Sequence, residues 1–148
     1  MRRFLVGFTV WAASLAAIYS GRMIRSVTAQ EKPATLRDGA FTAEQAARGD
    51  KLYAAECAAC HGPVGQGADQ SPALNGPTFI ANWSGLTLGD LMERIRTTMP
   101  QDNPGKLSRA EDSDVIAFLL KLNGFPSGKA ELPKDTPTLK LIKIEPPN

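Results

Sequence analysis

The sequence predicts an all-α fold of about three main helices and long loops. Three segments have a helix-start signal followed by apolar residues at helical spacing, and they open at Thr42, Thr87 and Ser108. Nowhere do apolar and polar residues alternate over the length of a strand. The stretches 62–86 and 99–107 show neither pattern and are expected to be irregular loops. Loops of that length in a compact domain usually have a functional reason, such as wrapping a cofactor.

The first helix is expected to run from Thr42 to about Cys57. Thr42 is the N-cap residue, and Gln45 three residues later completes a capping box. Phe41 stands where a hydrophobic staple would pack it on Ala46. Together these signals predict where the helix begins.

The second and third helices also begin with capping boxes. Asp90 lies three residues after Thr87. Glu111 lies three residues after Ser108. The apolar stripes that follow are Leu88, Leu91, Met92 and Ile95 in the second helix, and Val115, Phe118, Leu119 and Leu122 in the third. Gly124 then marks the end of the third helix.

Residues 1–29 are typical of an export signal peptide. Two arginines follow Met1, residues 4–19 are apolar, and small residues precede a cleavage point after Ala29. These sixteen residues are fewer than the roughly 20 that span a bilayer, so cleavage is favoured over an uncleaved membrane anchor. A buried core helix is disfavoured, because the run is N-terminal and flanked by arginines. The mature protein is therefore expected in the periplasm, with a membrane-anchored form as the alternative.

Three further regions follow the signal peptide. Residues 30–40 are expected to be a polar lead-in, 41–124 the folded domain and 125–148 a Pro-rich C-terminal tail. Five prolines lie in the last 24 residues. Proline cannot continue a helix or a central strand, so the tail is expected to wrap the surface in extended form.

The charge of the mature chain argues against nucleic-acid binding. The whole sequence has a net charge of +2. Four arginines and no acidic residue lie in residues 1–29, so the remainder holds 13 basic and 15 acidic residues and a net charge of −2. No basic cluster is left to bind a phosphate backbone.

The chemistry is concentrated in the pentapeptide Cys57-Ala58-Ala59-Cys60-His61. It contains the only two cysteines and the only histidine of the chain. Two cysteines at this spacing lie on adjoining faces of a helical turn, so both thiols can reach one haem while the next imidazole ligates its iron. A structural disulfide and another redox site are the alternatives. A zinc site is disfavoured, because four suitable ligands are not present. The sequence therefore predicts one covalent haem c.

The second axial ligand of this haem is expected to be a methionine. Of the four methionines, Met1 and Met23 belong to the signal peptide. Met92 lies on the apolar stripe of the second helix, where methionine usually fills a gap. Met99 follows that helix, and Pro100 disfavours the α conformation at Met99 and pushes it into an extended loop. Met99 is therefore the predicted iron ligand, and Met92 is the predicted packing residue.

The region 41–124 resembles the class I cytochromes c. The matching features are the segment from Cys57 to His61, the segment from Pro72 to Gly76, the pair Met99-Pro100 and the helix that contains Val115 to Leu120. The resemblance implies three helices and long loops around one haem, with His61 and Met99 on its opposite faces. It also implies that the carbonyl of Pro72 accepts a hydrogen bond from the His61 ring, which orients the imidazole and raises its basicity. An ordinary turn proline is the alternative for Pro72.

Other residues match the same family. Gly49 on the first helix implies a close crossing of the N- and C-terminal helices, with Phe118 as the partner across it, and Tyr53 also fits the pattern. Trp83 is similar to family residues that donate their indole N–H to a haem propionate. Simple core packing is the alternative for Trp83.

A finer resemblance concerns segments 99–108 and 123–133, which are similar to cytochromes associated with quinoprotein alcohol dehydrogenases. It implies a periplasmic dehydrogenase as electron donor, with an oxidase or another cytochrome as acceptor. The predicted function is one-electron transfer and not catalysis, because no nucleophile–base pair is present and His61 is already assigned. The alternatives are a haem subunit of a dehydrogenase complex and, if Met99 does not ligate, a ligand-binding or peroxide-reacting haem protein.

Overall fold

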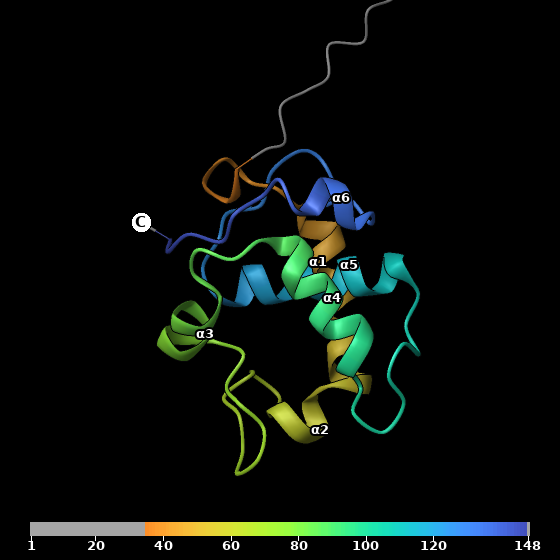
Figure 1. Cartoon of the computed structure of the whole chain (residues 1–148). Coiled ribbons are helices and arrows are strands. Elements are labelled where there is room, and N and C mark those ends of the chain that lie inside the picture. Colours follow the sequence, from red (N-terminus) through yellow and green to blue (C-terminus); the bar gives the residue numbers. More distant parts are fainter. Residues whose placement is uncertain (1–34, 148) are drawn as a thin grey trace, which may run out of the picture. The chain divides into compact units, whose positions relative to one another are not determined.

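The computed structural model describes residues 35–147, which form seven helical segments joined by loops (Figure 1). They are the 3-10 helix η1 (Leu36–Asp38) and the α-helices α1 (Ala43–Glu56), α2 (Ala58–His61), α3 (Gly76–Trp83), α4 (Leu88–Thr98), α5 (Arg109–Leu122) and α6 (Thr136–Leu139). Over these residues β pairing is limited to two isolated bridges. The predicted all-α class is confirmed. The predicted signal peptide and its cleavage point lie outside the described residues.

The capping boxes predicted for the second and third helices are present at the starts of α4 and α5. The Thr87 side chain accepts from the Asp90 N–H at 3.1 Å, and the Asp90 carboxylate accepts from the Thr87 N–H at 2.9 Å. Ser108 and Glu111 exchange the same two bonds at 3.3 and 2.8 Å. The Thr87 N–H lowers the pKa of Asp90, and the Ser108 N–H lowers the pKa of Glu111. Both starts are therefore fixed by short-range signals that are readable in the sequence.

The start of α1 differs from the prediction in one respect. The Thr42 side chain accepts from the Gln45 N–H at 3.1 Å, as a cap should, but the capping box is wrong. The Gln45 amide is buried and donates instead to the Ser113 hydroxyl and to the Leu132 carbonyl, both at 3.2 Å. Its oxygen accepts from the Leu132 N–H at 2.7 Å. A buried amide needs partners for its polar atoms, and α5 and the C-terminal tail supply them.

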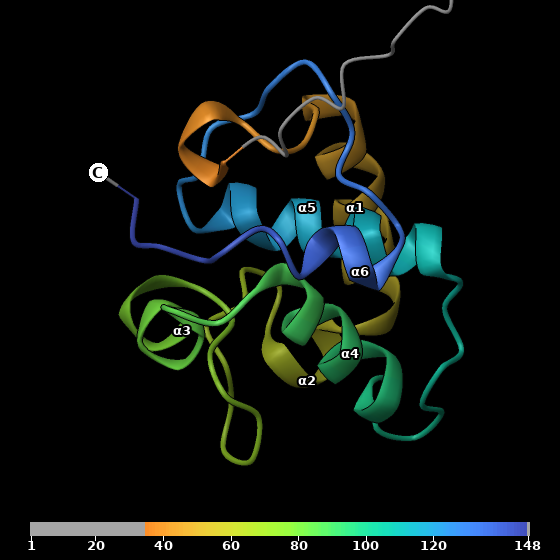
Figure 2. The same cartoon turned by 45° about the horizontal axis from the view of Figure 1, so that its top comes forward.

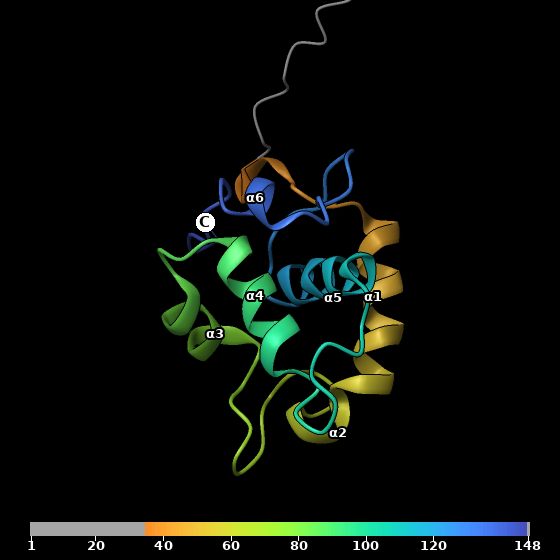
Figure 3. The same ribbon diagram turned by 45° about the vertical axis from the view of Figure 1, so that its right-hand side comes forward.

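The close crossing of α1 and α5 is confirmed (Figure 3). A Cβ on Gly49 would overlap the backbone carbonyl of Asp114 and would lie 2.9 Å from the Cβ of Phe118. The ring of Phe118 packs beside Tyr53, with ring centroids 5.0 Å apart. Gly49 therefore permits a backbone approach that any larger residue would prevent.

The region 62–86 was predicted to be irregular, but it contains helix α3. This helix is only eight residues long, and it has Pro at its first turn and no side-chain cap. Phe79 is its one buried residue. A helix this short shows no two-turn apolar stripe, so periodicity does not reveal it. The loop 99–107 contains no helix, as predicted.

The tail also differs from the expected surface wrapping. It contains α6, which packs on α4 (Figures 1 and 2). Its apolar side chains enter the main core, the buried cluster that also contains Phe79, Met92, Ile116 and Leu120. The buried tail residues of this core are Phe125, Leu132, Leu139, Ile142 and Ile144. The Ile142 carbonyl accepts from the Leu88 N–H at 2.9 Å, and the Ile144 N–H donates to the Leu86 carbonyl at 2.8 Å. The predicted polar lead-in also contributes apolar side chains, because Leu36 and Ala40 are buried in the same core. Both flanks therefore belong to the packed structure.

Candidate haem-binding site

The cysteine motif lies where α1 ends and the chain turns into α2. The backbone N–H of Cys57 donates to the Tyr53 carbonyl at 2.9 Å, and the N–H of His61 donates to the Cys57 carbonyl at 2.9 Å. Cys57 is half-buried against the second core cluster, whereas Cys60 is exposed. This cluster consists of Tyr53, Leu107, Val115, Phe118 and Leu119. Both thiols are free and are not joined in a disulfide. The motif therefore presents two separate thiols on one helical turn.

The environment of Cys57 is unlike that of a reactive redox thiol. Burial, with a smaller contribution from the neighbouring Glu56 carboxylate, raises the pKa of Cys57 to about 11. Cysteines of thiol–disulfide redox sites have a lowered pKa instead. Among residues 35–147, no group of three or more His, Cys, Asp or Glu side chains could hold a metal ion. The raised pKa of Cys57 therefore differs from that of a thioredoxin-like thiol.

His61 is buried, and its ring is oriented by a single backbone group. Its Nδ1 lies 2.9 Å from the carbonyl oxygen of Pro72. A carbonyl can only accept, so Nδ1 carries a proton, and in the neutral imidazole the lone pair is then on Nε2. A metal-binding histidine typically has this tautomer, with its second nitrogen bonded to a carbonyl. The contact implied by the family resemblance is present, while the role of both residues toward a haem remains a prediction.

The loop after His61 is tied by backbone hydrogen bonds. The N–H of Gly67 returns to the His61 carbonyl at 2.8 Å, and the N–H of Leu74 donates to the Gly65 carbonyl at 2.7 Å. The Asn75 side chain donates to the carbonyl of Val64. Gly65 and Gly67 have φ of 70° and 79°, a left-handed conformation that favours glycine. These bonds fold the loop back on itself and bring Pro72 to the imidazole.

Tyr53 adds a contact that the sequence did not reveal. Its hydroxyl donates to the Gly62 carbonyl at 2.7 Å and is buried in the second core cluster. Burial raises the pKa of Tyr53 to about 12. The residue that precedes Gly62 is His61, so this bond anchors the ligand segment to α1. Only the family match pointed to Tyr53, without this role.

Met99 and Met92 occupy different environments. Met99 ends α4 with φ −128° and ψ 149°, so the extended conformation predicted from Pro100 is confirmed. Its side chain is half-buried and packs against the main core. Met92 is fully buried in that core, as expected of a packing residue. Iron ligation by Met99 remains a prediction.

Trp83 lies at the end of α3. Its ring is half-buried and packs near Phe79, with ring centroids 6.4 Å apart. This contact agrees with the packing alternative and leaves the donation of its indole N–H to a haem propionate as a prediction.

These residues fit a haem c. The structure offers two free thiols one helical turn apart, an imidazole with Nε2 available, and a thioether in an extended segment after α4. Imidazole and thioether are the axial donors of low-spin cytochromes c. The loop 62–75 and the loop 99–107 lie at the same end of the domain as α2 (Figures 1 and 3). Partly buried apolar side chains from these segments, among them Ala58, Leu74 and Met99, suit an apolar cofactor.

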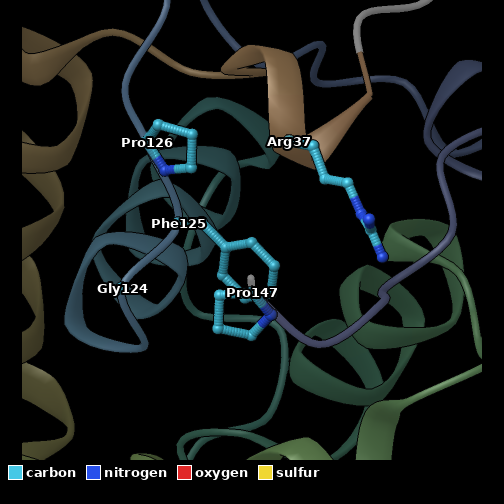
Figure 4. Close-up of a pocket in the computed structure, with 5 residues that line it drawn as sticks. All are labelled: Arg37, Gly124, Phe125, Pro126 and Pro147. Carbon is cyan, nitrogen blue, oxygen red and sulfur yellow. The ribbon is translucent and has the colours of Figure 1, made fainter.

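Figure 4 shows a small pocket of the structure. It is lined by Arg37, Gly124, Phe125, Pro126 and Pro147. None of the predicted site residues lines it.

Within residues 35–147 no helix has the length and apolar character needed to cross a membrane.

The family model described as cytochrome c oxidase, cbb3-type, subunit III, matches residues 44–119, just over half of the chain. The crystal structure of the sulfane dehydrogenase SoxCD from Paracoccus pantotrophus contains a chain with 26% sequence identity and a TM-score of 0.46. That match covers 68% of this chain and 55% of the other, so this chain spans only about half of its length. No curated protein sequence is significantly similar to this chain. The matched range 44–119 contains every predicted haem-site residue.

Proposed function

We propose that this chain holds one haem covalently through Cys57 and Cys60. The chain belongs to the cytochrome c family described as cbb3-type cytochrome c oxidase subunit III. It is therefore a class I c-type cytochrome and a haem electron carrier. The observation that most directly supports haem binding at this motif is the hydrogen bond between His61 Nδ1 and the Pro72 carbonyl. It frees Nε2 of the residue that follows Cys60 for an iron. The two free thiols on the same turn are available for thioether bonds.

His61 and Met99 are the proposed axial ligands. The haem, when bound, supplies the one-electron chemistry. The chain's own residues hold and tune it. Pro72 keeps the imidazole in one orientation and makes it more basic, and the segment after α4 supplies the thioether. With His61 and Met99 both holding the iron, no position would be open for peroxide or a gas.

We place this carrier in the periplasm, with an electron donor of the dehydrogenase class. The signal-peptide pattern of residues 1–29 supports export. The resemblance of segments 99–108 and 123–133 to cytochromes of quinoprotein alcohol dehydrogenases favours a quinoprotein donor acting on alcohols, and an oxidase or another cytochrome is the proposed acceptor. Contacts with such partners are transient and small in area.

The attachment and ligation are tested on protein matured in a haem-loading periplasm. Denaturation in acidic organic solvent followed by mass measurement should find the haem mass on the chain, which should begin at Gln30. Cys57→Ala with Cys60→Ala should release the haem in that solvent. Absorption spectra should be those of a low-spin haem in both oxidation states. Haem that is freely extracted from the wild-type chain would overturn covalent attachment, and a high-spin oxidised spectrum would overturn axial ligation by Met99.

The donor is tested by stopped-flow reduction of the oxidised protein. A purified quinoprotein alcohol dehydrogenase with its alcohol should reduce it at micromolar protein. If a different periplasmic dehydrogenase reduces it quickly while this donor does not, the electron carrier stands and the named donor is wrong.

A further inference from the structure

Asn123, which directly follows α5, links that helix to the loop that presents Pro72. Its side-chain nitrogen donates to the Leu119 carbonyl at 2.8 Å and to the Leu74 carbonyl at 2.9 Å. The residue is only 9% exposed. Its side-chain oxygen is the one buried side-chain polar atom without a hydrogen-bond partner over residues 35–147.

The orientation of this amide follows from its partners. Two carbonyl oxygens face it, and both can only accept, so the nitrogen must point toward them. The oxygen on the other side is thereby left without a partner, although buried polar atoms normally have one. The amide is therefore oriented by the two carbonyls that it joins and not by partners of its own oxygen.

The helix end does not need this side chain. Backbone groups already close α5: the N–H of Asn123 donates to the Leu119 carbonyl at 3.1 Å, and the N–H of Phe125 donates to the Leu120 carbonyl at 3.1 Å. The N–H of Gly124, with φ 82°, donates to the Lys121 carbonyl at 3.0 Å. The bond to Leu74 therefore does something other than cap the helix.

Leu74 is the fixed point of the loop. Its N–H donates to the Gly65 carbonyl, its carbonyl accepts from Asn123, and its side chain packs on the second core cluster. It lies two residues after Pro72, whose carbonyl accepts from His61. Holding Leu74 on both backbone polar groups limits where the Pro72 carbonyl can lie.

We propose that Asn123 is a positioning residue for the haem ligand, holding the loop at Leu74 so that the Pro72 carbonyl stays on Nδ1 of His61. The inference rests on the proposed function, because it takes His61 as an axial ligand. A well-placed carbonyl makes the imidazole a stronger donor and so favours ferric iron. Without Asn123 the hydrogen bond weakens, and the midpoint potential rises.

Two variants separate this role from helix capping. Asn123→Ala removes both side-chain bonds. Asn123→Ser keeps a hydroxyl that can return to the carbonyl four residues earlier in α5 but is too short to reach Leu74. Leu120→Val is the control: Leu120 is buried in the main core, whereas Leu74 packs on the second core cluster, so this substitution should destabilise the fold through the main core. All are compared with the wild-type holoprotein.

Two readouts report on the imidazole and not on overall stability. One is the midpoint potential, and the other is the exchange rate of the His61 Nδ1 proton by NMR. Both Asn123 variants should raise the potential and accelerate proton exchange, whereas Leu120→Val should change neither. If the variants lower thermal stability but leave both readouts at wild-type values, Asn123 only caps α5 and the inference is wrong. A wild-type chain without haem, or with an iron that His61 does not ligate, would instead overturn the proposed function and this inference with it.

Discussion

The crossing of α1 and α5 and the two loops of the haem site are held by different interactions. At the crossing, Gly49 lets the two backbones meet, and Phe118 packs on Tyr53. In the loops, Leu74, Met99 and Leu107 pack on the apolar clusters, and individual hydrogen bonds at Pro72 and Leu74 hold the backbone beside His61. The helical frame is thus set mainly by close packing, whereas the loop beside His61 also depends on individual polar contacts. Substitutions should affect stability in the frame and spectra or potential in the loops.

The largest contrast is expected between the two methionines. Met99→Ala should remove the thioether from the iron and convert the oxidised haem to high spin or to a foreign ligand, as seen in the absorption spectrum. Met92→Leu nearly conserves volume in the buried core, so it should leave the spectrum alone and lower the free energy of unfolding by under about 1.5 kcal/mol. If Met92→Leu changed the spectrum and Met99→Ala did not, the ligand assignment would be reversed.

Substitutions in the C-terminal tail test whether the tail is part of the packed helical frame. Leu139 on α6 is fully buried in the main core, so Leu139→Ala should lower the free energy of unfolding by about 2–5 kcal/mol. Leu141 is 69% exposed two residues later, and Leu141→Ala should stay within about 0.5 kcal/mol of wild type. Urea unfolding of the holoproteins measures both. Equal small effects would mean that the tail is a surface wrapping after all.

The frame could be predicted from the sequence because its signals are local. The boxes at Thr87 and Ser108 lie within four residues, and the stripes behind them repeat at helical spacing. The cysteine motif and the Met99-Pro100 pair are also local, so the candidate ligands were found without a structure. The chain's membership of a cytochrome c family agrees with that interpretation.

What the sequence did not reveal depends on partners far along the chain. Gln45 binds Leu132, 87 residues away, so its apparent capping role was misread. Asn123 binds Leu74, 49 residues earlier, whereas locally Asn123 signals only a helix end. Helix α6 spans only the four residues Thr136–Leu139, so it is too short to show a periodic apolar pattern. Long-range polar contacts leave no spacing in the sequence by which they could be recognised.

A substitution at Gly49 tests the crossing of α1 and α5, because helix propensity and packing predict opposite signs for the change in the free energy of unfolding. Alanine is favoured over glycine within a helix by about 1 kcal/mol, so propensity alone predicts that Gly49→Ala stabilises. The overlap with the Asp114 carbonyl, a backbone atom, should reverse that sign and lower the free energy of unfolding by about 1–3 kcal/mol. Ala54→Gly, on the exposed side of α1, should cost about 1 kcal/mol by propensity. A stabilising Gly49→Ala would mean that the helices can separate without cost.

The smallest effect is expected at the start of α4, a helix that begins in the frame and ends at Met99. The N–H of Thr87 lowers the pKa of Asp90, so the folded state favours the carboxylate more than the unfolded state does. The stability that the Asp90 carboxylate gives the folded state is complete above the ordinary carboxyl pKa of 3.8. It is lost as the pH falls through the lower pKa that Asp90 has in the folded state.

Asp90→Asn keeps the shape of the box but removes the charge, and should lower the free energy of unfolding by about 0.5 kcal/mol near neutral pH. The difference from wild type should shrink as pH falls below about 4, because protonated aspartic acid then resembles asparagine. Urea unfolding at a series of pH values measures it. Across the same series the haem spectrum of the variant should match that of wild type, since the box lies at the opposite end of α4 from Met99. A stability difference that stays constant with pH would show that the carboxylate charge plays no part in the box, and a changed spectrum would show that the frame and the ligand loop are coupled through α4.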